Sequence, residues 1–453
     1  MSVRKAAIHH QLIDEFLDQV CKPVKAKEMH PDIRQEITAH LEERIEELIS
    51  EGMTEEEAVR MAIARMGSPE EVGRQFHQVH KPRTEWTLIL LLALLIGIGL
   101  VAMLAMQTAL EDNDRVSNAG FFEKKAVFGI IGLVAVAVIY FVDYRKLQAY
   151  SSYLYFIVVM VMLLAKLEGV TISGSGSWFV VGAVSINVPM TATYLFMITL
   201  AGMIRPREPK SSSFLIKIRT FIKELFVYLI PGWLYLLNPT LPAFMLYVSG
   251  LSALLLFAGK WRTWLAYIVG MAAAAGLMLL YGTGARIEYV TNRLLAYVDP
   301  ASNPDANFMA ARSLEAIRSA GLWGHGFGVK NDRLGYIYSD MIYTYLIYSL
   351  GWAMGLLIAF AFAALLIRAA GVVSKLSDPY GKRIVVGVIT ILSVQFGWNM
   401  LMCVGLLPIT GISLPLIGYS TFSMVVDMAA IGVILSVYRR KDIFASRPTM
   451  QSE

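Results

Sequence analysis

Residues 86–109 read WTLILLLALLIGIGLVAMLAMQTA, a stretch without a charged side chain. About 20 consecutive apolar residues are enough for an α-helix to cross the roughly 30 Å hydrocarbon core of a membrane. Comparable apolar runs recur along the rest of the chain. The whole sequence is 56% hydrophobic and 17% charged, with a mean hydropathy of +0.55, whereas soluble domains are roughly 45–50% apolar. The chain is therefore predicted to be a multi-pass membrane protein.

The apolar runs are continuous and do not alternate with polar residues, which favours helices over the strands of a membrane barrel. We predict an all-α, polytopic protein of about ten transmembrane helices, preceded by a small soluble helical domain. The expected crossings lie near residues 86–109, 126–142, 150–166, 190–204, 221–237, 242–259, 262–282, 340–367, 384–404 and 415–437.

Basic residues indicate the orientation of these crossings. They cluster in connections on one side, at residues 145–146, 205–219, 260–262, 368–383 and 439–441, with Lys124 and Lys125 as the exception on the other side. Because cytoplasmic loops carry an excess of Lys and Arg, both termini are predicted to be cytoplasmic. Residues 167–189, 283–339 and 405–414 would then lie outside. The net charge of +5 reflects this topology, and no nucleic-acid-binding face is predicted.

Residues 1–82 differ from the rest because they are rich in Glu, Arg and His. An apolar stripe at helical spacing predicts an amphipathic helix that ends near residue 51, and it consists of Ile33, Ile37, Leu41, Ile45 and Leu48. Thr54 with Glu57 is a capping-box pattern, and a second one starts at Ser68 with proline at the first helical position. We predict three parts: a cytoplasmic helical prefix domain at 1–82, a membrane domain at 83–441 with a large extracellular loop at 283–339, and a cytoplasmic tail at 442–453.

The connection at 283–339 is long enough to be a folded loop. It carries a set of cations, namely Arg286, Arg293, Arg312, Arg318, Lys330 and Arg333. Long loops escape the positive-inside rule, so simple tolerance of these charges is one interpretation. The other is an anion site at the membrane surface, where Arg and Lys would hold a diphosphate by charge-assisted hydrogen bonds.

The end of this loop, residues 321–340, reads GLWGHGFGVKNDRLGYIYSD and leads into an apolar run. An ionisable residue at the mouth of a membrane segment is costly to place there, which makes Asp340 a functional candidate. The alternative is a helix N-terminal carboxylate with Ser339 as the N-cap. The glycines predict a tight loop and lack the Lys-Ser/Thr ending of a phosphate-binding P-loop. His325 is either a loop residue shaped by these glycines or a general acid or base.

Other ionisable residues give weaker signals. No acid–His pair has ligand spacing on one helical face, so no metal site is predicted; no cofactor is evident, and whether a divalent cation assists a diphosphate is left open. The predicted crossings hold few charges beyond Lys223, Glu224 and Asp427. Transport would prefer ionisable residues inside the helices, so a transporter is the least favoured function. Asp427 is placed near the cytoplasmic half of its helix.

Residues 86–440 resemble the SEDS family, the FtsW-, RodA- and SpoVE-like polytopic proteins of bacterial cell-wall synthesis. The resemblance is carried by Gln395, Asn399, residues 405–417 (GLLPITGISLPLI) and Tyr419, and in the loop by residues 293–300, 313–317 and 321–328. The prefix resembles the HAAS or permease-prefix type of cytoplasmic domain, through residues 37–43, 52–58 and 66–72.

The SEDS resemblance implies a peptidoglycan glycosyltransferase that polymerises lipid II at the outer face of the bacterial cell membrane, in cell division, cell shape or sporulation. Residues 338–343 (YSDMIY) stand in place of the family's catalytic motif, so the resemblance assigns catalysis to Asp340. A base would take the proton from the acceptor's C4 hydroxyl, and cations would offset the charge of the leaving diphosphate. Candidates for binding the diphosphate or glycan are Arg286, Arg293, Arg312, Arg318, His325, Lys330 and Arg333.

The resemblance also implies two partners, an undecaprenyl-diphosphate-linked substrate (lipid II) and a monofunctional class B penicillin-binding transpeptidase. The sequence departs from the family pattern at Thr191 and Tyr194, which stand where the family has a Glu and a Lys. Two alternatives follow. One is a catalytically inactive SEDS-like scaffold or signal-responsive regulator of wall synthesis, and the other, less favoured, is a transporter of a lipid-linked precursor.

Overall fold

The computed structural model describes residues 2–24, 30–79, 84–110, 120–172, 175–182, 184–204, 214–238, 240–281, 304–335, 337–419 and 421–441. The chain forms two compact units. The first contains residues 1–84 together with 376–378 and 438–453, and the second contains residues 85–375 and 379–437. We call the first the prefix unit and the second the membrane unit.

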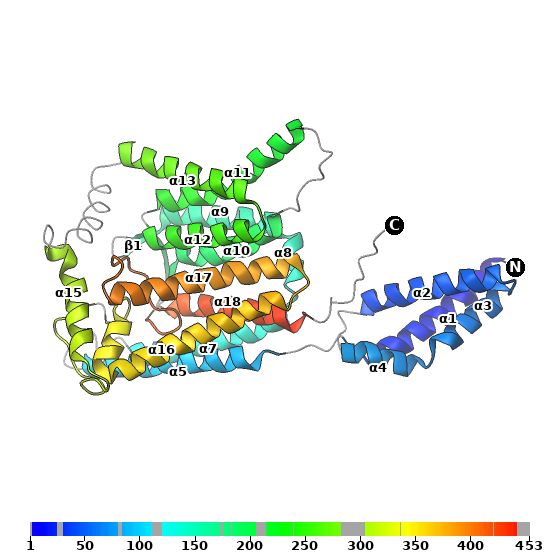
Figure 1. Ribbon diagram of the computed structural model, residues 1–453, viewed down its shortest axis with the longest axis horizontal. Coiled ribbons are helices and arrows are strands. Elements are labelled where there is room, and N and C mark those ends of the chain that lie inside the picture. Colours follow the sequence, from blue (N-terminus) through cyan, green and yellow to red (C-terminus); the bar gives the residue numbers. More distant parts are fainter. Residues whose placement is uncertain are drawn as a thin grey trace. The chain divides into compact units, whose positions relative to one another are not determined.

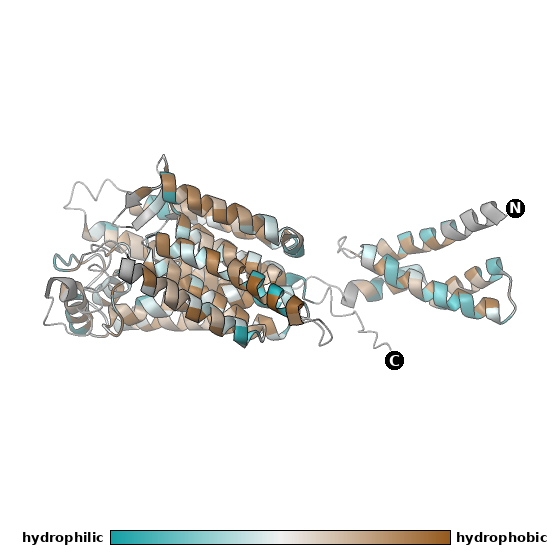
Figure 2. Ribbon diagram, turned by 90° about the horizontal axis from the view of Figure 1, so that it is seen from above, coloured by the Kyte–Doolittle hydropathy of each residue, from teal (hydrophilic) through white to brown (hydrophobic). Residues whose placement is uncertain are grey.

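The described part of the prefix unit forms four helices, α1 (Ser2–Cys21), α2 (His30–Ser50), α3 (Glu55–Met66) and α4 (Pro69–Val79). The predicted apolar stripe of α2 is confirmed, because Ile33, Ile37, Leu41, Ile45 and Leu48 are all buried in one hydrophobic cluster. Phe16, Leu17 and Val20 of α1 and Ala58, Val59 and Ala62 of α3 complete this core. Teal, hydrophilic residues cover much of the remaining surface of these helices (Figure 2).

The predicted cap between α2 and α3 is also confirmed. Thr54 Oγ1 donates to Glu57 Oε2 at 2.7 Å, and the Thr54 backbone N–H faces the same carboxylate at 3.4 Å. These hydrogen bonds favour the charged carboxylate and lower the pKa of Glu57. The next helix, α4, begins at Pro69 as predicted.

In its described residues, the membrane unit is helical apart from one small sheet (Figure 1). Its helices are α5 (Trp86–Ala109), α7 (Phe121–Phe141), α8 (Arg145–Ala149), α9 (Ser151–Glu168), α10 (Val188–Met203), α11 (Phe214–Leu237), α12 (Leu241–Phe257), α13 (Trp261–Tyr281), α15 (Pro304–Ser319), α16 (Ile342–Ser374), α17 (Pro379–Cys403) and α18 (Thr421–Arg439).

Within the described residues, 7 helices are long and apolar enough to span a membrane, namely α5, α7, α9, α11, α16, α17 and α18, and α10 and α12 are shorter apolar helices. With α13, these helices occupy every one of the predicted crossing positions. The fold prediction, a polytopic all-α membrane protein, is therefore confirmed. Brown, apolar residues run along most of their length (Figure 2).

Three local features differ from the sequence-based expectation. The last crossing begins at Thr421 instead of residue 415, because residues 415–419 form turns. The crossing predicted from residue 340 begins at Ile342. A three-stranded antiparallel sheet, β1 (Val170–Ile172), β2 (Ser175–Val181) and β3 (Val184–Asn187), in the order β1-β2-β3, precedes α10 and was not predicted.

Small residues allow the central helices to pack closely. A Cβ on Gly250 of α12 would lie 2.7 Å from Met197 Sδ of α10, and one on Gly387 of α17 would lie 3.1 Å from Met197 Cβ. On the other side of the unit, a Cβ on Gly432 of α18 would lie 3.1 Å from Val136 Cα of α7. Close backbone approach through glycine is the usual way in which helices associate in a membrane.

Candidate active site

Asp340 lies in a turn that immediately precedes α16. The helix begins at Ile342 with Met341 as its N-cap residue, so Asp340 is not on the helix and Ser339 is not its cap. The expected helix N-terminal carboxylate capped by Ser339 is therefore wrong. The side chain of Asp340 is half-buried, and its backbone is fixed by the two segments described next.

The first segment is the end of α17. Asn399, which is fully buried, donates from Nδ2 to the carbonyl oxygen of Asp340 at 3.0 Å and to that of Ile412 at 2.7 Å. The thiol of Cys403, one turn further along, also points at the Asp340 carbonyl, with the sulfur 3.7 Å from the oxygen. One buried amide thus joins the turn at Asp340 to the turn that follows α17.

The second segment is that following turn, residues 408–419. The backbone N–H of Tyr419 donates to the carbonyl of Tyr338 at 2.7 Å. A Cβ on Gly411 would lie 3.7 Å from Asp340 Oδ2, so the carboxylate sits beside a residue without a side chain. The backbone at Gly411 has a φ of 78°, a left-handed conformation that glycine adopts more easily than other residues. The signature residues recognised in the sequence therefore surround Asp340.

Phe121 of α7 packs against two tyrosines next to the Asp340 turn, Tyr338 and Tyr419. The ring of Phe121 stacks on Tyr338 with the centroids 5.8 Å apart and meets Tyr419 edge-on at 4.6 Å. Aromatic pairs at these separations add stability beyond their buried area. Burial raises the pKa of the Tyr419 phenol, so its hydroxyl stays protonated at neutral pH.

The Gly-rich segment 321–326 packs into a break in α16. The helical conformation of α16 is interrupted at Gly351 (φ 84°, ψ 175°). The N–H groups of Trp352 and Ala353 donate to the carbonyls of Gly321 and Leu322, and the carbonyls of Tyr348 and Ser349 accept from the N–H groups of His325 and Gly326. The loop thus satisfies the backbone groups that the break frees, as a membrane environment demands.

The predicted tight glycine loop is confirmed by these contacts. A Cβ on Gly324 would lie 2.3 Å from the Ser349 carbonyl oxygen, and a Cβ on Gly351 would lie 2.1 Å from that of Leu322. Such distances are far inside van der Waals contact. Gly324 of the loop and Gly351 of α16 therefore have a structural role, which is to let two backbones meet.

Helix α15 carries several of the candidate cations and packs beside the site. Its buried Ser313 donates to the carbonyl of Cys403 at 2.7 Å and shares a 2.7 Å hydrogen bond with Thr344, in the first turn of α16. This contact attaches α15 to the two helices that flank Asp340. It also leaves Arg312 and Glu315, on either side of Ser313 in the sequence, partly exposed.

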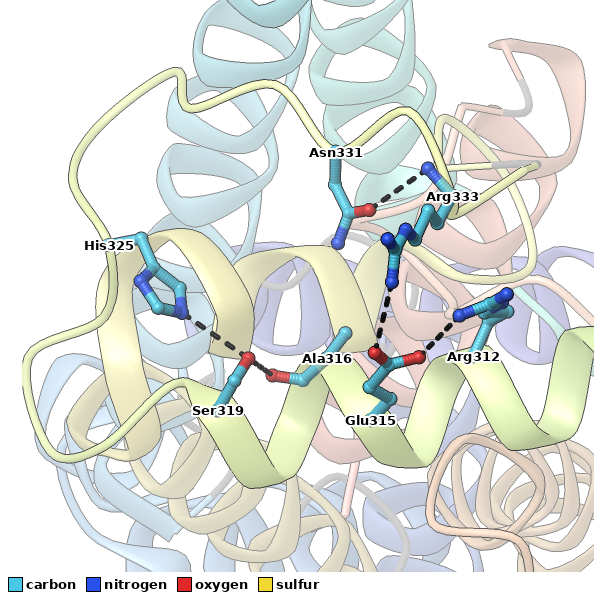
Figure 3. Close-up of polar contacts among 7 residues, drawn as sticks. All are labelled: Arg312, Glu315, Ala316, Ser319, His325, Asn331 and Arg333. Carbon is cyan, nitrogen blue, oxygen red and sulfur yellow. Dashed lines mark hydrogen bonds and ion pairs between the residues drawn. The ribbon is translucent and has the colours of Figure 1, made fainter.

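Two predicted cations converge on one acid (Figure 3). Arg312 Nη1 lies 2.6 Å from Glu315 Oε2, and Arg333 Nη1 reaches the other oxygen of the same carboxylate at 3.3 Å. Their side chains are 30%, 69% and 55% exposed for Arg312, Arg333 and Glu315, respectively. Exposed ion pairs contribute only about 0–1 kcal/mol, so a stronger anion could displace Glu315 at little cost.

The other predicted binding residues are distributed around this cluster. His325 Nε2 lies 3.3 Å from Ser319 Oγ, and its ring packs against Tyr348. Lys330 pairs with Asp332 at 3.2 Å. Arg318 lines a surface hollow of about 530 Å³ along α15, together with Glu315 and Ser319. Arg286 and Arg293 lie outside the described residues.

A buried polar network that the sequence did not predict lies behind the 408–419 turn. Lys125 Nζ donates to the carbonyls of Ile417 and Gly418, at 3.1 and 2.8 Å. Asp427 accepts from the Tyr194 hydroxyl at 2.7 Å, and the same hydroxyl lies 3.1 Å from Gln395 Oε1. Asp427 lies in the N-terminal half of α18, and its place relative to the cytoplasmic side stays a prediction.

The site combines one half-buried carboxylate with cations on the neighbouring helix α15 and in the loop that follows it. A carboxylate can accept a proton, and arginine and lysine can bind a diphosphate. Within the described residues there is no group of three His, Cys, Asp or Glu side chains that could hold a metal ion. The chemistry that these side chains support by themselves is proton transfer next to an anionic group.

Comparison with known sequences places this arrangement in a family. Residues 85–443 match the model of the cell cycle proteins FtsW, RodA and SpoVE. The stage V sporulation protein E of Bacillus subtilis (strain 168) is 28% identical over 368 residues, which cover 79% of this chain and 98% of that protein. The probable peptidoglycan glycosyltransferase FtsW of Thioalkalivibrio sulfidiphilus (strain HL-EbGR7) is 27% identical over 391 residues, 84% of this chain and 95% of that protein.

Solved structures show the same fold. A chain from a structure of a peptidoglycan synthase complex that coordinates polymerization and crosslinking superposes with a TM-score of 0.63 at 20% identity, covering 79% of this chain and 98% of that one. The rod shape determining protein RodA of Thermus thermophilus superposes with a TM-score of 0.55 at 18% identity, covering 79% and 97%. The chain thus belongs to the FtsW/RodA/SpoVE family of cell cycle proteins, the SEDS family recognised in its sequence.

Proposed function

We propose that this protein is a peptidoglycan glycosyltransferase that polymerises lipid II, with Asp340 as its catalytic base. The observation that carries the proposal is the position of Asp340. Asn399, Gly411 and Tyr419, which belong to the sequence signature of the family, all contact the turn that contains it. The resemblance to FtsW and SpoVE over 79% and more of the chain supports the same reaction.

In this reaction the Asp340 carboxylate takes the proton of the acceptor's C4 hydroxyl while the oxygen attacks the anomeric carbon of the donor sugar. The bond from that carbon to the donor's diphosphate breaks, and the undecaprenyl diphosphate leaves with the electron pair. Arg312, Arg318 and Arg333 are proposed to offset its negative charge, and Lys330 and His325 to contact the diphosphate or glycan. Arg286 and Arg293 remain candidates for the same role.

The proposed orientation places this chemistry at the outer face of the bacterial membrane, with both termini cytoplasmic. Clusters of Lys and Arg at 145–146, 368–383 and 439–441 support it through the positive-inside rule. A monofunctional class B penicillin-binding transpeptidase is the proposed partner. The fold shared with a chain of a peptidoglycan synthase complex supports this partnership.

The test is polymerisation of purified lipid II by the detergent-solubilised protein, alone and with a class B transpeptidase. Wild-type protein is expected to make glycan strands, and Asp340→Asn is expected to lose them while keeping its folded yield. Glu168→Gln is a matched control, because Glu168 is an exposed acid at the end of another membrane helix. Absence of polymer from folded wild-type protein under every pairing would refute the proposal.

A second candidate function is that of an inactive scaffold or signal-responsive regulator of wall synthesis. It is favoured by Thr191 and Tyr194, where the family has two charged residues, and by the prefix unit with its own core. On this proposal the prefix is a cytoplasmic domain that reads a signal. Deletion of residues 1–82 decides its role: retained polymerisation with altered regulation in cells indicates a sensor, whereas loss of the protein from the membrane indicates a folding role.

A further inference from the structure

The turn at residues 416–418 is held by two charged side chains that are both buried. Lys125 of α7 is 0% exposed and Asp427 of α18 is 4% exposed. Lys125 donates to the carbonyls of Ile417 and Gly418, while Asp427 accepts a hydrogen bond from the backbone of Leu416. The two side chains thus bind opposite ends of one turn.

The backbone of this turn needs such support. Leu416 has a φ of 64°, in the left-handed region that side chains with a Cβ rarely adopt. Strain of this kind is unfavourable and persists only where the surrounding structure enforces it. Gly99 of α5 makes room on a third side, because a Cβ there would lie 2.9 Å from the Leu416 carbonyl oxygen and 3.2 Å from Lys125 Cε.

Burying these two ionisable side chains has a cost of its own. Removing charged groups from water is unfavourable, and replacing buried charges by apolar residues is often neutral or stabilising. Stability alone is therefore a weak reason for this arrangement. The Tyr194 hydroxyl donates to the same Asp427 carboxylate at 2.7 Å.

Residues at the end of this turn contact the two residues that precede Asp340 in the chain. Gly418 packs against Ser339, since a Cβ on Gly418 would lie 3.4 Å from the Ser339 carbonyl oxygen. The next residue, Tyr419, donates its N–H to the Tyr338 carbonyl. Asp340 follows these two partners in the chain. A shift of the 416–418 turn would therefore move the segment that carries the carboxylate.

We propose that Lys125 and Asp427 are positioning residues that clamp the 416–418 turn and, through Tyr338 and Ser339, hold Asp340 in the place where it reacts. This inference rests on the proposed glycosyltransferase function for its catalytic consequence. The clamp itself is a property of the fold and has a readout that does not depend on activity.

The decisive variant is Lys125→Met/Asp427→Asn, which removes both charges together and so leaves no unpaired buried ion. The matched control is Lys124→Met, because Lys124 is the exposed neighbour of Lys125 on α7. Hydrogen exchange of the peptides that contain residues 337–341 and 416–419 is measured in the full-length protein, with lipid II polymerisation beside it. The double variant is expected to lose protection in both peptides, and the control is expected to keep it.

The kinetic expectation is a loss of kcat with little change in KM, because the cations that bind the diphosphate are left in place. Misplacement of a reacting group by about 1 Å costs roughly 100-fold in rate, which sets the expected fall in kcat. A merely structural role would instead lower the folded yield and leave kcat per folded molecule unchanged. Wild-type protection and wild-type kcat in a folded double variant would overturn the inference.

The same experiments also cover two further outcomes, an inactive wild-type protein and a double variant that does not fold. If wild-type protein makes no polymer, the proposed function fails, and hydrogen exchange still decides whether the clamp exists. If the double variant does not fold, Tyr194→Phe replaces it, because this change removes one hydrogen bond to Asp427 without altering charge. Tyr194→Phe is expected to reduce the hydrogen-exchange protection of residues 416–419 partially. Unchanged protection and unchanged kcat in this variant would also overturn the inference.

Discussion

The side-chain amide of Asn399 donates to the carbonyl oxygen of Asp340 at 3.0 Å. The same nitrogen also donates to the carbonyl oxygen of Ile412, at 2.7 Å, and so joins the turn at Asp340 to the turn that follows α17. Asn399 is 0% exposed, so water cannot take over this role. The hydrogen bond explains why a polar residue is kept in the apolar interior of a membrane helix.

Asn399→Asp is expected to abolish polymerisation. The substitution keeps the shape of the side chain but replaces the donor by an acceptor that faces two carbonyl oxygens, and each carbonyl would lose its partner in a buried place. An unsatisfied buried group costs about 1–3 kcal/mol. Polymerisation rate and melting temperature are measured together. Asn399→Asp with normal activity would show that the Asp340 turn does not depend on this amide.

Glu315→Gln is expected to strengthen substrate binding. The change releases Arg312 and Arg333 from the carboxylate that they share, and both become available to a diphosphate. Since exposed pairs contribute only about 0–1 kcal/mol, KM for lipid II should fall by a factor of a few. Arg312→Gln/Arg333→Gln should raise KM, and added salt should weaken binding to wild type by screening.

The control for this prediction is Glu168→Gln, which removes the charge of an exposed acid at the end of α9. A similar fall in KM there would point to a general effect of surface charge. A rise in KM for Glu315→Gln would contradict the proposed role of the two arginines and indicate that Glu315 itself contacts the substrate.

The membrane crossings could be predicted from the sequence, and Asp340 could be proposed as the catalytic residue, because each has a local signal. Twenty apolar residues in a row identify a span, and a motif of consecutive residues identifies the acid. The exact start of α18 could not be predicted, since residues 415–419 are as apolar as a helix but turn at Leu416, with its positive φ. Tertiary contacts from Lys125 and Asp427 decide that turn, and they come from helices far apart in the sequence.

The same reason explains why the contacts of the charged residues could not be predicted. Lys125 stands as an exception among loop cations, and Asp427 as an unassigned acid, because a sequence shows each alone. The cations of the loop are predicted as one anion-binding set, and that role stays a prediction. In the structure the described members lie in different contacts: Arg312 and Arg333 on Glu315, Lys330 on Asp332, His325 on Ser319, and Arg318 in a surface hollow.

The Thr54–Glu57 cap predicts a pH dependence within the prefix unit. The pKa of Glu57 is lowered in the folded state by hydrogen bonds from Thr54, so the unfolded chain binds its proton more readily. The stabilisation from this cap is therefore fully present above the ordinary Glu pKa of 4.5 and is lost as the pH falls through the lowered value.

Thr54→Ala tests this dependence in the full-length protein. The loss of an N-cap side chain typically costs about 1 kcal/mol, so hydrogen exchange in α3 should be faster in the variant at pH 6. The difference between variant and wild type should shrink as the pH is lowered below 4.5, after correction for the intrinsic exchange rates. An equal difference at both pH values would show that the capping hydrogen bonds do not depend on the charge of Glu57.

Two glycines of the same loop provide a matched test of the contact between the loop and α16. Gly321 and Gly324 have similar positive φ angles, 60° and 72°, so alanine strains both backbones to a similar degree, by roughly 1–2 kcal/mol. They differ in their surroundings: a Cβ on Gly321 would meet nothing within 4 Å, whereas one on Gly324 would lie 2.3 Å from the Ser349 carbonyl oxygen. Gly324→Ala must therefore push the loop out of the break at Gly351 and expose its backbone groups.

We expect Gly324→Ala to lower the melting temperature clearly more than Gly321→Ala and to impair polymerisation, because the displaced loop is joined to α15 and to the segment before Asp340. Equal effects of the two substitutions would show that backbone strain, and not the contact with α16, is what these glycines relieve.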